Sequence, residues 1–248
     1  MKIIAVMPAY NAAKTLEPTV RDIPPGIVDE IIVVDDASKD NTVEVAQRLG
    51  VTVVCHNSNR GYGANQKTCY RLALERGADI VVMIHPDYQY DSHLTPYLVG
   101  FIRDSYFDVM LGSRIRTRSE ALNGGMPLYK YLANRILTFI ENILTGHNFS
   151  EWHTGFRAYS RKVLDTIPWE SNSDDFVFDS QMLVQCIAFG FRVGEIPVPV
   201  RYHASSSSIN MRRSITYGLQ TLQTIGFFLL HRMHLVRSSL FRAKKNRD

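Results

Sequence analysis

Short runs of consecutive apolar residues recur along the first half of the chain, and polar or turn-forming residues close each of them. The runs cover residues 3–7, 31–34, 51–54, 80–84 and 109–111. Continuous apolar runs of this length predict strands that helices cover on both faces, and therefore a parallel sheet.

Helix signals fill the intervals between these runs. Asn41 and Glu44 have the spacing of a capping box, and Gly77 stands where a helix C-cap belongs. An apolar stripe with the helical period predicts a further helix around residues 94–102, capped by Asp91 or Ser92. This alternation of strands and helices predicts an α/β fold, with a mostly parallel open sheet flanked by helices.

The second half of the chain is less regular. We expect the following elements there: a helix with an apolar face over residues 128–143, a short strand over 155–159, a helix over 178–187 that stops at Gly190, an edge strand over 193–200 and an amphipathic helix over 213–236. The edge position is expected because Pro197 and Pro199 lack the N–H group that an inner strand needs.

The composition is that of a globular protein, with 45% hydrophobic and 21% charged residues in 248, and it excludes a disordered chain, a coiled coil and collagen. No apolar run reaches the roughly 18 residues of a membrane-spanning helix. Met1 leads straight into a strand-like segment without a cleavable signal. Three scattered cysteines predict a reduced, cytoplasmic compartment and no zinc site.

The C-terminal segment is basic, with nine Lys or Arg and one acid from Arg201 onward. Its expected helix aligns apolar residues on one face, namely Ile215, Leu219, Leu222, Ile225, Leu229 and Met233. Such a helix suits an anionic membrane surface, and the alternatives are packing on the domain or pairing with a second copy in a homo-oligomer. No nucleic-acid partner is expected, because the basic tail lacks interleaved aromatic residues.

Polar residues follow four of the predicted strands, at the sheet edge where open α/β folds bind ligands. They are Pro8-Ala9-Tyr10-Asn11, Asp35-Asp36-Ala37-Ser38, His85-Pro86-Asp87-Tyr88-Gln89 and Gly112-Ser113-Arg114. Asp36 has the alternative role of capping the next helix, Asp87 that of opening a turn, and Arg114 that of a solvated surface residue. Gly61-Tyr62-Gly63 matches no phosphate-loop pattern, so we expect it to form a turn that opens a helix from Ala64.

Together these segments resemble family 2 glycosyltransferases with the GT-A fold, which is Rossmann-like. Residues 154–159 (Thr-Gly-Phe-Arg-Ala-Tyr) and 194–197 (Gly-Glu-Ile-Pro) are most similar to the dolichyl-phosphate mannose synthase branch. The similarity reaches about Ile209. We therefore expect a GT-A domain over residues 1–211, and an amphipathic helix with a basic tail over residues 212–248, at the inner face of a membrane.

The resemblance implies inverting, metal-dependent transfer of a sugar from a UDP- or GDP-linked donor to a lipid-linked or polysaccharide-precursor acceptor of the cell envelope. Asp87 stands at the last acid of the family's Asp-x-Asp motif, which implies a bound Mg²⁺ or Mn²⁺, with Gln89 and His85 beside it. Pro8, Tyr10 and Asp35 are implied to hold the base and ribose of the donor. The other residues expected on the donor side are Ala9, Asn11, Val33, Asp36, Arg114 and His203.

The chain departs from the family pattern at two places. His85 replaces the first acid of the motif, and a neutral imidazole can ligate a metal but adds no negative charge. His203 and Ile209 replace an arginine and a lysine of the branch's basic motif, which weakens the case for a polyprenyl-phosphate acceptor.

A general base is needed for a hydroxyl acceptor but hardly for a phosphate, which is already ionised. We expect Asp179 in this role, with Asp175 as the second candidate. The alternative for Asp174 and Asp175 is to cap the helix that follows them. The alternative function is a catalytically silent nucleotide-binding or scaffold protein that retains the GT-A fold.

Overall fold

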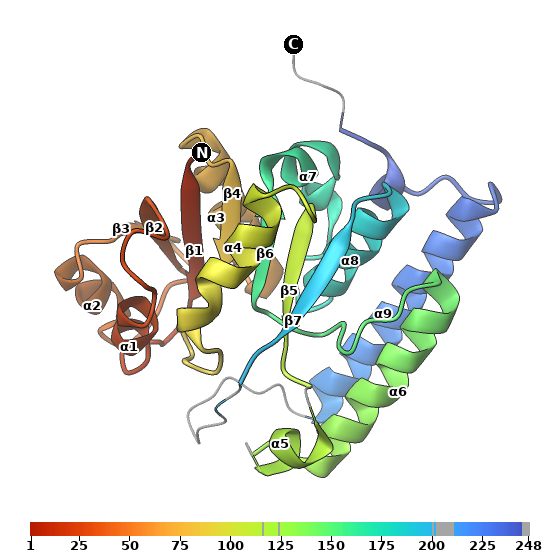
Figure 1. Ribbon diagram of the computed structural model, residues 1–248, viewed down its shortest axis with the longest axis horizontal. Helices are drawn as coiled ribbons and strands as arrows, with labels where there is room; N and C mark the ends of the chain where they lie inside the picture. Colours follow the sequence, from red (N-terminus) through yellow and green to blue (C-terminus); the bar gives the residue numbers. More distant parts are fainter. Residues whose placement is uncertain (116, 124, 200, 202–210, 245–248) are drawn as a thin grey trace.

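A seven-stranded sheet forms the centre of the computed structural model, which describes all residues except 116, 124, 200, 202–210 and 245–248 (Figure 1). The strand order is β3-β2-β1-β4-β6-β5-β7. The strands are β1 (Ile3–Ala9), β2 (Glu30–Asp35), β3 (Thr52–Cys55), β4 (Ile80–Met83), β5 (Val109–Ser113), β6 (Arg157–Ser160) and β7 (Val193–Pro197). The open, mostly parallel α/β sheet expected from the apolar runs is confirmed.

Helices occupy the intervals between the strands, and two of them, over residues 118–123 and 161–166, were not predicted from the sequence. They are α1 (Leu16–Arg21), α2 (Thr42–Arg48), α3 (Tyr62–Glu75), α4 (Thr95–Arg103), α5 (Arg118–Asn123), α6 (Leu128–Thr145), α7 (Arg161–Thr166), α8 (Phe178–Ala188) and α9 (Met211–Arg232). Asp91 caps the 3₁₀ turn before α4, where its side chain accepts a hydrogen bond from the His93 N–H. Asn41 is the N-cap residue of α2, but its side chain makes no capping hydrogen bond.

Alternate residues of each central strand enter two hydrophobic cores, one on either face of the sheet. Ile4 and Val6 of β1 join the core that also contains residues of α3, α8 and α9. Ala5 and Met7 join the core on the other face, with residues of α1, α2 and α4. This double burial explains why the strands read as continuous apolar runs.

β6 is the strand that breaks the parallel order, because it pairs antiparallel with both β4 and β5. It brings the segment before it, residues 151–156, to the edge of the sheet where β4 and β5 end. Within the described residues β7 pairs only with β5, so the predicted edge position is confirmed.

The start of α3 packs closely against the loop before α8, backbone on backbone. The helix begins at Tyr62, two residues earlier than expected, after Gly61 in a left-handed conformation (φ 95°). The Gly63 N–H donates to the Asp174 carbonyl at 2.8 Å, and a Cβ on Gly63 would lie 2.4 Å from the Ser173 carbonyl oxygen. A side chain at position 63 would therefore push the two elements apart.

α6 and α9 lie side by side at one end of the molecule (Figure 1). The apolar face predicted for α9 is divided: Ile225 is fully buried, whereas Leu219 and Met233 are each 64% exposed. α6 is likewise exposed on its outer apolar side, at Leu132, Ile136, Phe139 and Ile143. In the part of the chain that the structure describes, no helix is both long and apolar enough to cross a bilayer.

Candidate active site

The carboxyl ends of β1 and β2 lie next to each other and carry the residues expected on the donor side. Ala9 is in register with Asp35, and the Asn11 N–H donates to Ser38 Oγ at 2.8 Å. Asp35 Oδ2 accepts from the Ser38 N–H at 2.9 Å, whereas its buried Oδ1 has no hydrogen-bond partner within the described residues. A buried, unsatisfied carboxylate oxygen is costly unless a ligand donor reaches it. Tyr10 is half exposed beside this edge.

Two residues expected on the donor side, Asp36 and Val33, make contacts within the protein instead of facing the cavity. The Asp36 carboxylate contacts His56 Nδ1 at 2.7 Å and accepts from the N–H groups of Arg60 and Gly61 at 2.9 and 3.0 Å. Val33 is fully buried in the core. The structure therefore places both beneath the sheet edge, where they hold the β2 end and the turn before α3.

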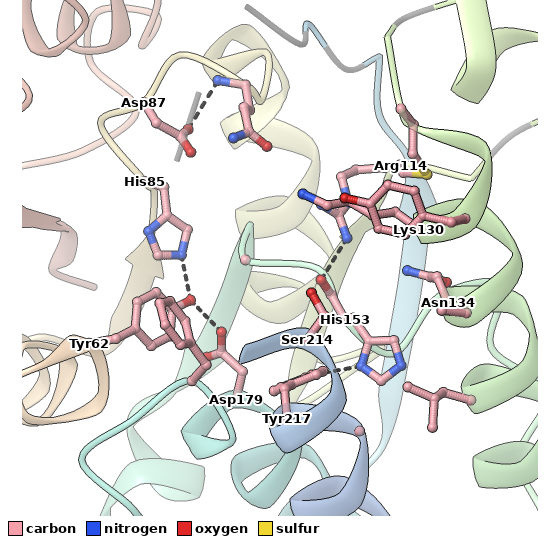
Figure 2. Close-up of a pocket in the computed structure, with 18 of the residues that line it drawn as sticks. Tyr62, His85, Asp87, Arg114, Lys130, Asn134, His153, Asp179, Ser214 and Tyr217 are labelled. Atoms are coloured by element: carbon pink, nitrogen blue, oxygen red, sulfur yellow. Dashed lines mark hydrogen bonds between the residues drawn. The ribbon is translucent and has the colours of Figure 1, made fainter. Parts of the chain in front are cut away.

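A cavity of about 440 Å³ opens between the end of β4 and the α6–α9 pair (Figure 2). His85 and Asp87 lie on one side of it, with Tyr62 and Asp179 below them, and Arg114, Lys130 and Asn134 face them from the other side. Much of the remaining lining is apolar, including Met126, Ala133, Leu137, Ile215 and Phe176. The cavity thus combines acidic, basic and apolar walls.

A hydrogen-bonded chain links His85 to Asp179 through Tyr62. The Tyr62 hydroxyl donates to Asp179 Oδ2 at 2.5 Å and lies 2.9 Å from His85 Nε2. Burial and the Asp179 charge raise the pKa of Tyr62, so the phenol keeps its proton. Because that proton points at Asp179, His85 Nε2 carries the hydrogen towards Tyr62, and the lone pair of the neutral ring lies on Nδ1.

The surroundings of His85 favour this neutral form. Burial lowers the pKa of the imidazole, and the opposing attraction of Asp87 does not reverse the shift. The ring packs against Gly155, where a Cβ would lie 2.3 Å from His85 Cδ2. Gly155 is therefore the residue that leaves room for a histidine at this strand end.

The donor set at the β4 end fits a divalent cation that also binds a substrate phosphate. The residues that could supply ligands are Asp87, with its carboxylate, and His85 and Gln89, with an imidazole nitrogen and an amide oxygen, and all three line the same cavity. The Gln89 N–H donates to Asp87 Oδ1 at 3.1 Å, which orients the carboxylate. So few protein ligands leave most coordination positions to diphosphate oxygens and water, as is typical of Mg²⁺ and Mn²⁺ sites.

Arg114 is held by a carboxylate that is completely buried. Its Nε donates to Glu151 Oε1 at 2.9 Å, its Nη2 contacts the same oxygen, and its backbone N–H donates to Oε2 at 2.8 Å. Asn134 donates to Glu151 Oε1 at 2.9 Å. Burial raises the pKa of Glu151, but attraction to Arg114 and the bonds from it outweigh burial and lower the pKa overall. Glu151 thus fixes the guanidinium at the cavity wall, beside Lys130, whose pKa burial and Arg114 lower.

We expect Glu151→Ala to destabilise the protein by about 3–5 kcal/mol, because it leaves a partly buried guanidinium without its anion. A folded-state pKa below the unfolded value of 4.5 means that the pair contributes its stability above that pH and loses it as the pH falls through the lowered pKa. Urea unfolding at pH 7 and pH 4 measures both effects. An equal midpoint for the variant and the parent at pH 7 would show that the pair is energetically neutral.

Several cavity residues were not anticipated from the sequence. His153 Nδ1 lies 2.7 Å from the Tyr217 hydroxyl, which is 2.8 Å from Ser180 Oγ, so α9 is tied to the residue next to Asp179. The sequence predicted Tyr62 only as part of a turn. Its position between two glycines, Gly61 and Gly63, is the feature of the sequence that could have singled it out. Lys130 lies on α6, a helix that the sequence predicted only from its apolar face.

Not all of the expected residues come together. Asp175 is exposed, does not line the cavity, and accepts from the Phe176 N–H at 2.8 Å. The Asp174 carbonyl caps α3, and its carboxylate pairs with Lys67 at 2.7 Å. His203 and Ile209 lie outside the described residues.

The model of the family described as Glycosyl transferase family 2 matches residues 4–167. A UDP-N-acetylglucosamine–dolichyl-phosphate N-acetylglucosaminyltransferase of Methanococcus voltae is 28% identical over 253 residues, covering 95% of this chain and 96% of the relative. An undecaprenyl-phosphate mannosyltransferase of Micrococcus luteus is 25% identical over 205 residues, covering 80% and 83%.

Among solved structures, the glucosyl-3-phosphoglycerate synthase of Mycobacterium tuberculosis in complex with Mn²⁺, UDP-glucose and phosphoglyceric acid superposes with a TM-score of 0.68 at 22% identity. The match covers 96% of this chain and 81% of that one. This likeness confirms the GT-A fold.

Proposed function

We propose that this chain, which belongs to glycosyl transferase family 2, transfers a sugar from a nucleoside-diphosphate donor to a polyprenyl phosphate with the help of Mn²⁺ or Mg²⁺. Both relatives described above are named for transfer to a polyprenyl phosphate. One of them uses a UDP-sugar, and the solved neighbour binds UDP-glucose and Mn²⁺. We therefore favour a UDP-linked donor, with a GDP-linked donor as the alternative.

One observation carries the proposal: a single cavity joins the Asp87 strand end to a wall that is both basic and apolar. Arg114 and Lys130 supply charge for an acceptor phosphate on the side that faces Asp87. Leu137 and Ile215 supply apolar surface for the first part of a polyprenyl chain. These cations offer a phosphate site independent of His203 and Ile209.

The donor would lie across the ends of β1, β2 and β4. Asp35 Oδ1 is placed to accept a hydrogen bond from an N–H group of the base, and Pro8, Ala9, Tyr10 and Asn11 border the same edge. Asp87, His85 and Gln89 would hold the cation, which when bound stabilises negative charge on the departing diphosphate. Arg114 is oriented by Glu151 towards the same space.

Asp179 has a role that depends on the acceptor. A phosphate acceptor is ionised at neutral pH, and Asp179 then orients His85 through Tyr62. A hydroxyl acceptor would lose a proton during the displacement, and Asp179, which lines the cavity, is our candidate to take it.

The test is a transfer assay with the full chain, Mn²⁺, a panel of radiolabelled UDP- and GDP-sugars, and dolichyl or undecaprenyl phosphate in detergent micelles. We expect label in the organic-extractable lipid and one nucleoside diphosphate released per sugar transferred. Nucleotide binding without diphosphate release from any donor would favour the silent scaffold. Release with label only in a water-soluble product would reject the lipid acceptor.

We further propose that the outer faces of α6 and α9 rest on an anionic membrane surface. Exposed apolar residues line both helices, and basic residues such as Arg213, Arg232 and Arg237 lie on α9 or just after it. This pattern of apolar and basic groups is typical of helices that lie in the interface of a bilayer. Close access to the membrane would also bring the cavity to a lipid-linked acceptor.

The pair of substitutions Leu219→Glu and Phe139→Glu is expected to abolish most flotation with anionic liposomes, because both side chains are 64% exposed and neither enters a core. Tyr97→Glu, at an exposed position of α4, is the matched control and should float like the parent. Unchanged flotation of the double variant would reject this face as the membrane contact. Loss of a dimer in its place would identify the face as a contact between two copies.

A further inference from the structure

The loop that carries Asp87 has an unfavourable backbone conformation at its centre. Tyr88, between Asp87 and Gln89, has φ 58°, in the left-handed region that residues with a side chain rarely adopt. A loop with this conformation needs contacts that hold it, since relaxation of Tyr88 would redirect both neighbouring side chains. One such contact is the hydrogen bond from the Gln89 N–H to Asp87, already described.

Arg201, beyond the end of β7, supplies such contacts from a distant part of the chain. Its guanidinium lies over the Tyr88 ring, 4.8 Å from the centroid, and its backbone N–H donates to the Gln89 carbonyl at 2.9 Å. Stacking and a backbone hydrogen bond therefore act on two successive residues of the loop. Hydrogen bonding to Asp22 raises the pKa of the Tyr88 phenol, so the ring is also held at its other end.

Two carboxylates form ion pairs with the Arg201 guanidinium, at distances longer than a hydrogen bond. Nη1 lies 3.5 Å from Asp22 Oδ2, and Nη2 lies 3.7 Å from Asp91 Oδ2. Ligand atoms of Asp22, Asp91 and His93 approach one another within 4.8 Å, which is close enough for a metal cluster. The arginine already provides the positive charge there, so we assign these carboxylates to Arg201 and not to a second cation.

We propose that Arg201 is a positioning residue that locks the loop from Asp87 to Asp91 in the conformation that directs Asp87 and Gln89 at the donor diphosphate. This inference rests on the proposed function for the identity of what Asp87 holds. It adds a residue outside the cavity lining that acts through Tyr88 and Gln89. Loss of the lock should lower the affinity for the cation more than it lowers the maximal rate.

The test compares Arg201→Ala and Arg201→Lys with the parent. Arg192→Ala is the matched control, because Arg192 is an exposed arginine at the opposite end of β7 that pairs with Asp108 at 3.1 Å. Hydrogen exchange of the metal-free protein reports on the loop, through the amides of residues 87–91. Electron paramagnetic resonance of Mn²⁺ titrated with UDP present reports on the site.

For Arg201→Ala we expect loop exchange to be about ten-fold faster and the Mn²⁺ Kd to rise about 10- to 100-fold, with kcat within a few-fold of the parent at saturating Mn²⁺. Lysine keeps the charge but not the planar stacking, so Arg201→Lys should lie between the two. Unchanged exchange would overturn the proposal, and so would a change that Arg192→Ala reproduces. If the parent itself binds no Mn²⁺ with UDP, the proposed function fails, while the exchange data still decide whether Arg201 locks the loop.

Discussion

Replacing Asp87 by asparagine is expected to lower kcat with saturating donor about a thousand-fold. Asp87 is the acid at the end of β4 in the cavity, and its partners His85 and Gln89 are neutral. An amide removes the negative charge that attracts the cation, and a cation is worth several kcal/mol at a departing diphosphate, with each 1.36 kcal/mol equal to about one factor of ten. The measurement is steady-state release of nucleoside diphosphate at fixed Mn²⁺.

The Mn²⁺ dependence of the Asp87→Asn variant shows whether its low rate comes from weaker cation binding or from misfolding. The variant should unfold at the same urea concentration as the parent and should regain part of its activity as Mn²⁺ is raised. Asp165→Asn, which removes an exposed carboxylate on α7, is the matched charge control and should keep the parent rate. Turnover of Asp87→Asn within ten-fold of the parent would exclude Asp87 as the residue that holds the cation.

Asp179→Asn is expected to lose at least about a hundred-fold in kcat while donor binding survives. The bonds around Asp179 favour one orientation of the new amide. Gln66 Nε2 donates to Asp179 Oδ1 at 3.1 Å, and the Tyr70 hydroxyl donates to Gln66 Oε1 at 3.1 Å, so Gln66 in its present orientation favours an oxygen at the Oδ1 position. The asparagine therefore presents its oxygen to Gln66 and its NH₂ group to Tyr62.

This arrangement reverses the hydrogen-bonded chain. Tyr62 would accept from the asparagine and donate to His85 Nε2, which would move the imidazole hydrogen to Nδ1 and remove the lone pair that we propose for the cation. The rate loss should then come with a higher Mn²⁺ requirement. If Asp179 instead acts only as a general base for a hydroxyl acceptor, the same rate loss should leave the Mn²⁺ requirement unchanged, and an unchanged rate would remove Asp179 from both roles.

Tyr62→Phe separates these two explanations further. It breaks the link between His85 and Asp179 but leaves the Asp179 carboxylate in the cavity. A raised Mn²⁺ requirement in both variants supports orientation of His85. A rate loss in Asp179→Asn alone supports proton abstraction.

The architecture of the chain was largely predictable because burial on both faces leaves a strong local signal. Val6 and Met7 face different cores, so the strand that contains them is apolar throughout. The antiparallel direction of β6 has no comparable signal, since a four-residue strand reads alike in both directions. The course of α9 was predicted, but not that Ile225 would be buried while Leu219 on the same expected face is exposed.

The sequence predicted those residues of the candidate site that directly follow a strand. It did not predict those that lie on helices. Asp87 and Arg114 lie at strand ends, and fold class alone brings such positions to one edge. Tyr62, Lys130 and Tyr217 come from α3, α6 and α9, and their meeting depends on how those helices pack. The locking contacts of Arg201 involve residues more than a hundred positions apart, which local patterns do not reveal.

Crystals grown with Mn²⁺ and UDP, with anomalous scattering used to locate the ion, test the central claim most directly. We predict one strong manganese peak within coordination distance of the Asp87 carboxylate and of the nucleotide's diphosphate, with the His85 ring beside it. A peak elsewhere, or a diphosphate bound without any ion near Asp87, would contradict the account of how this chain binds its donor.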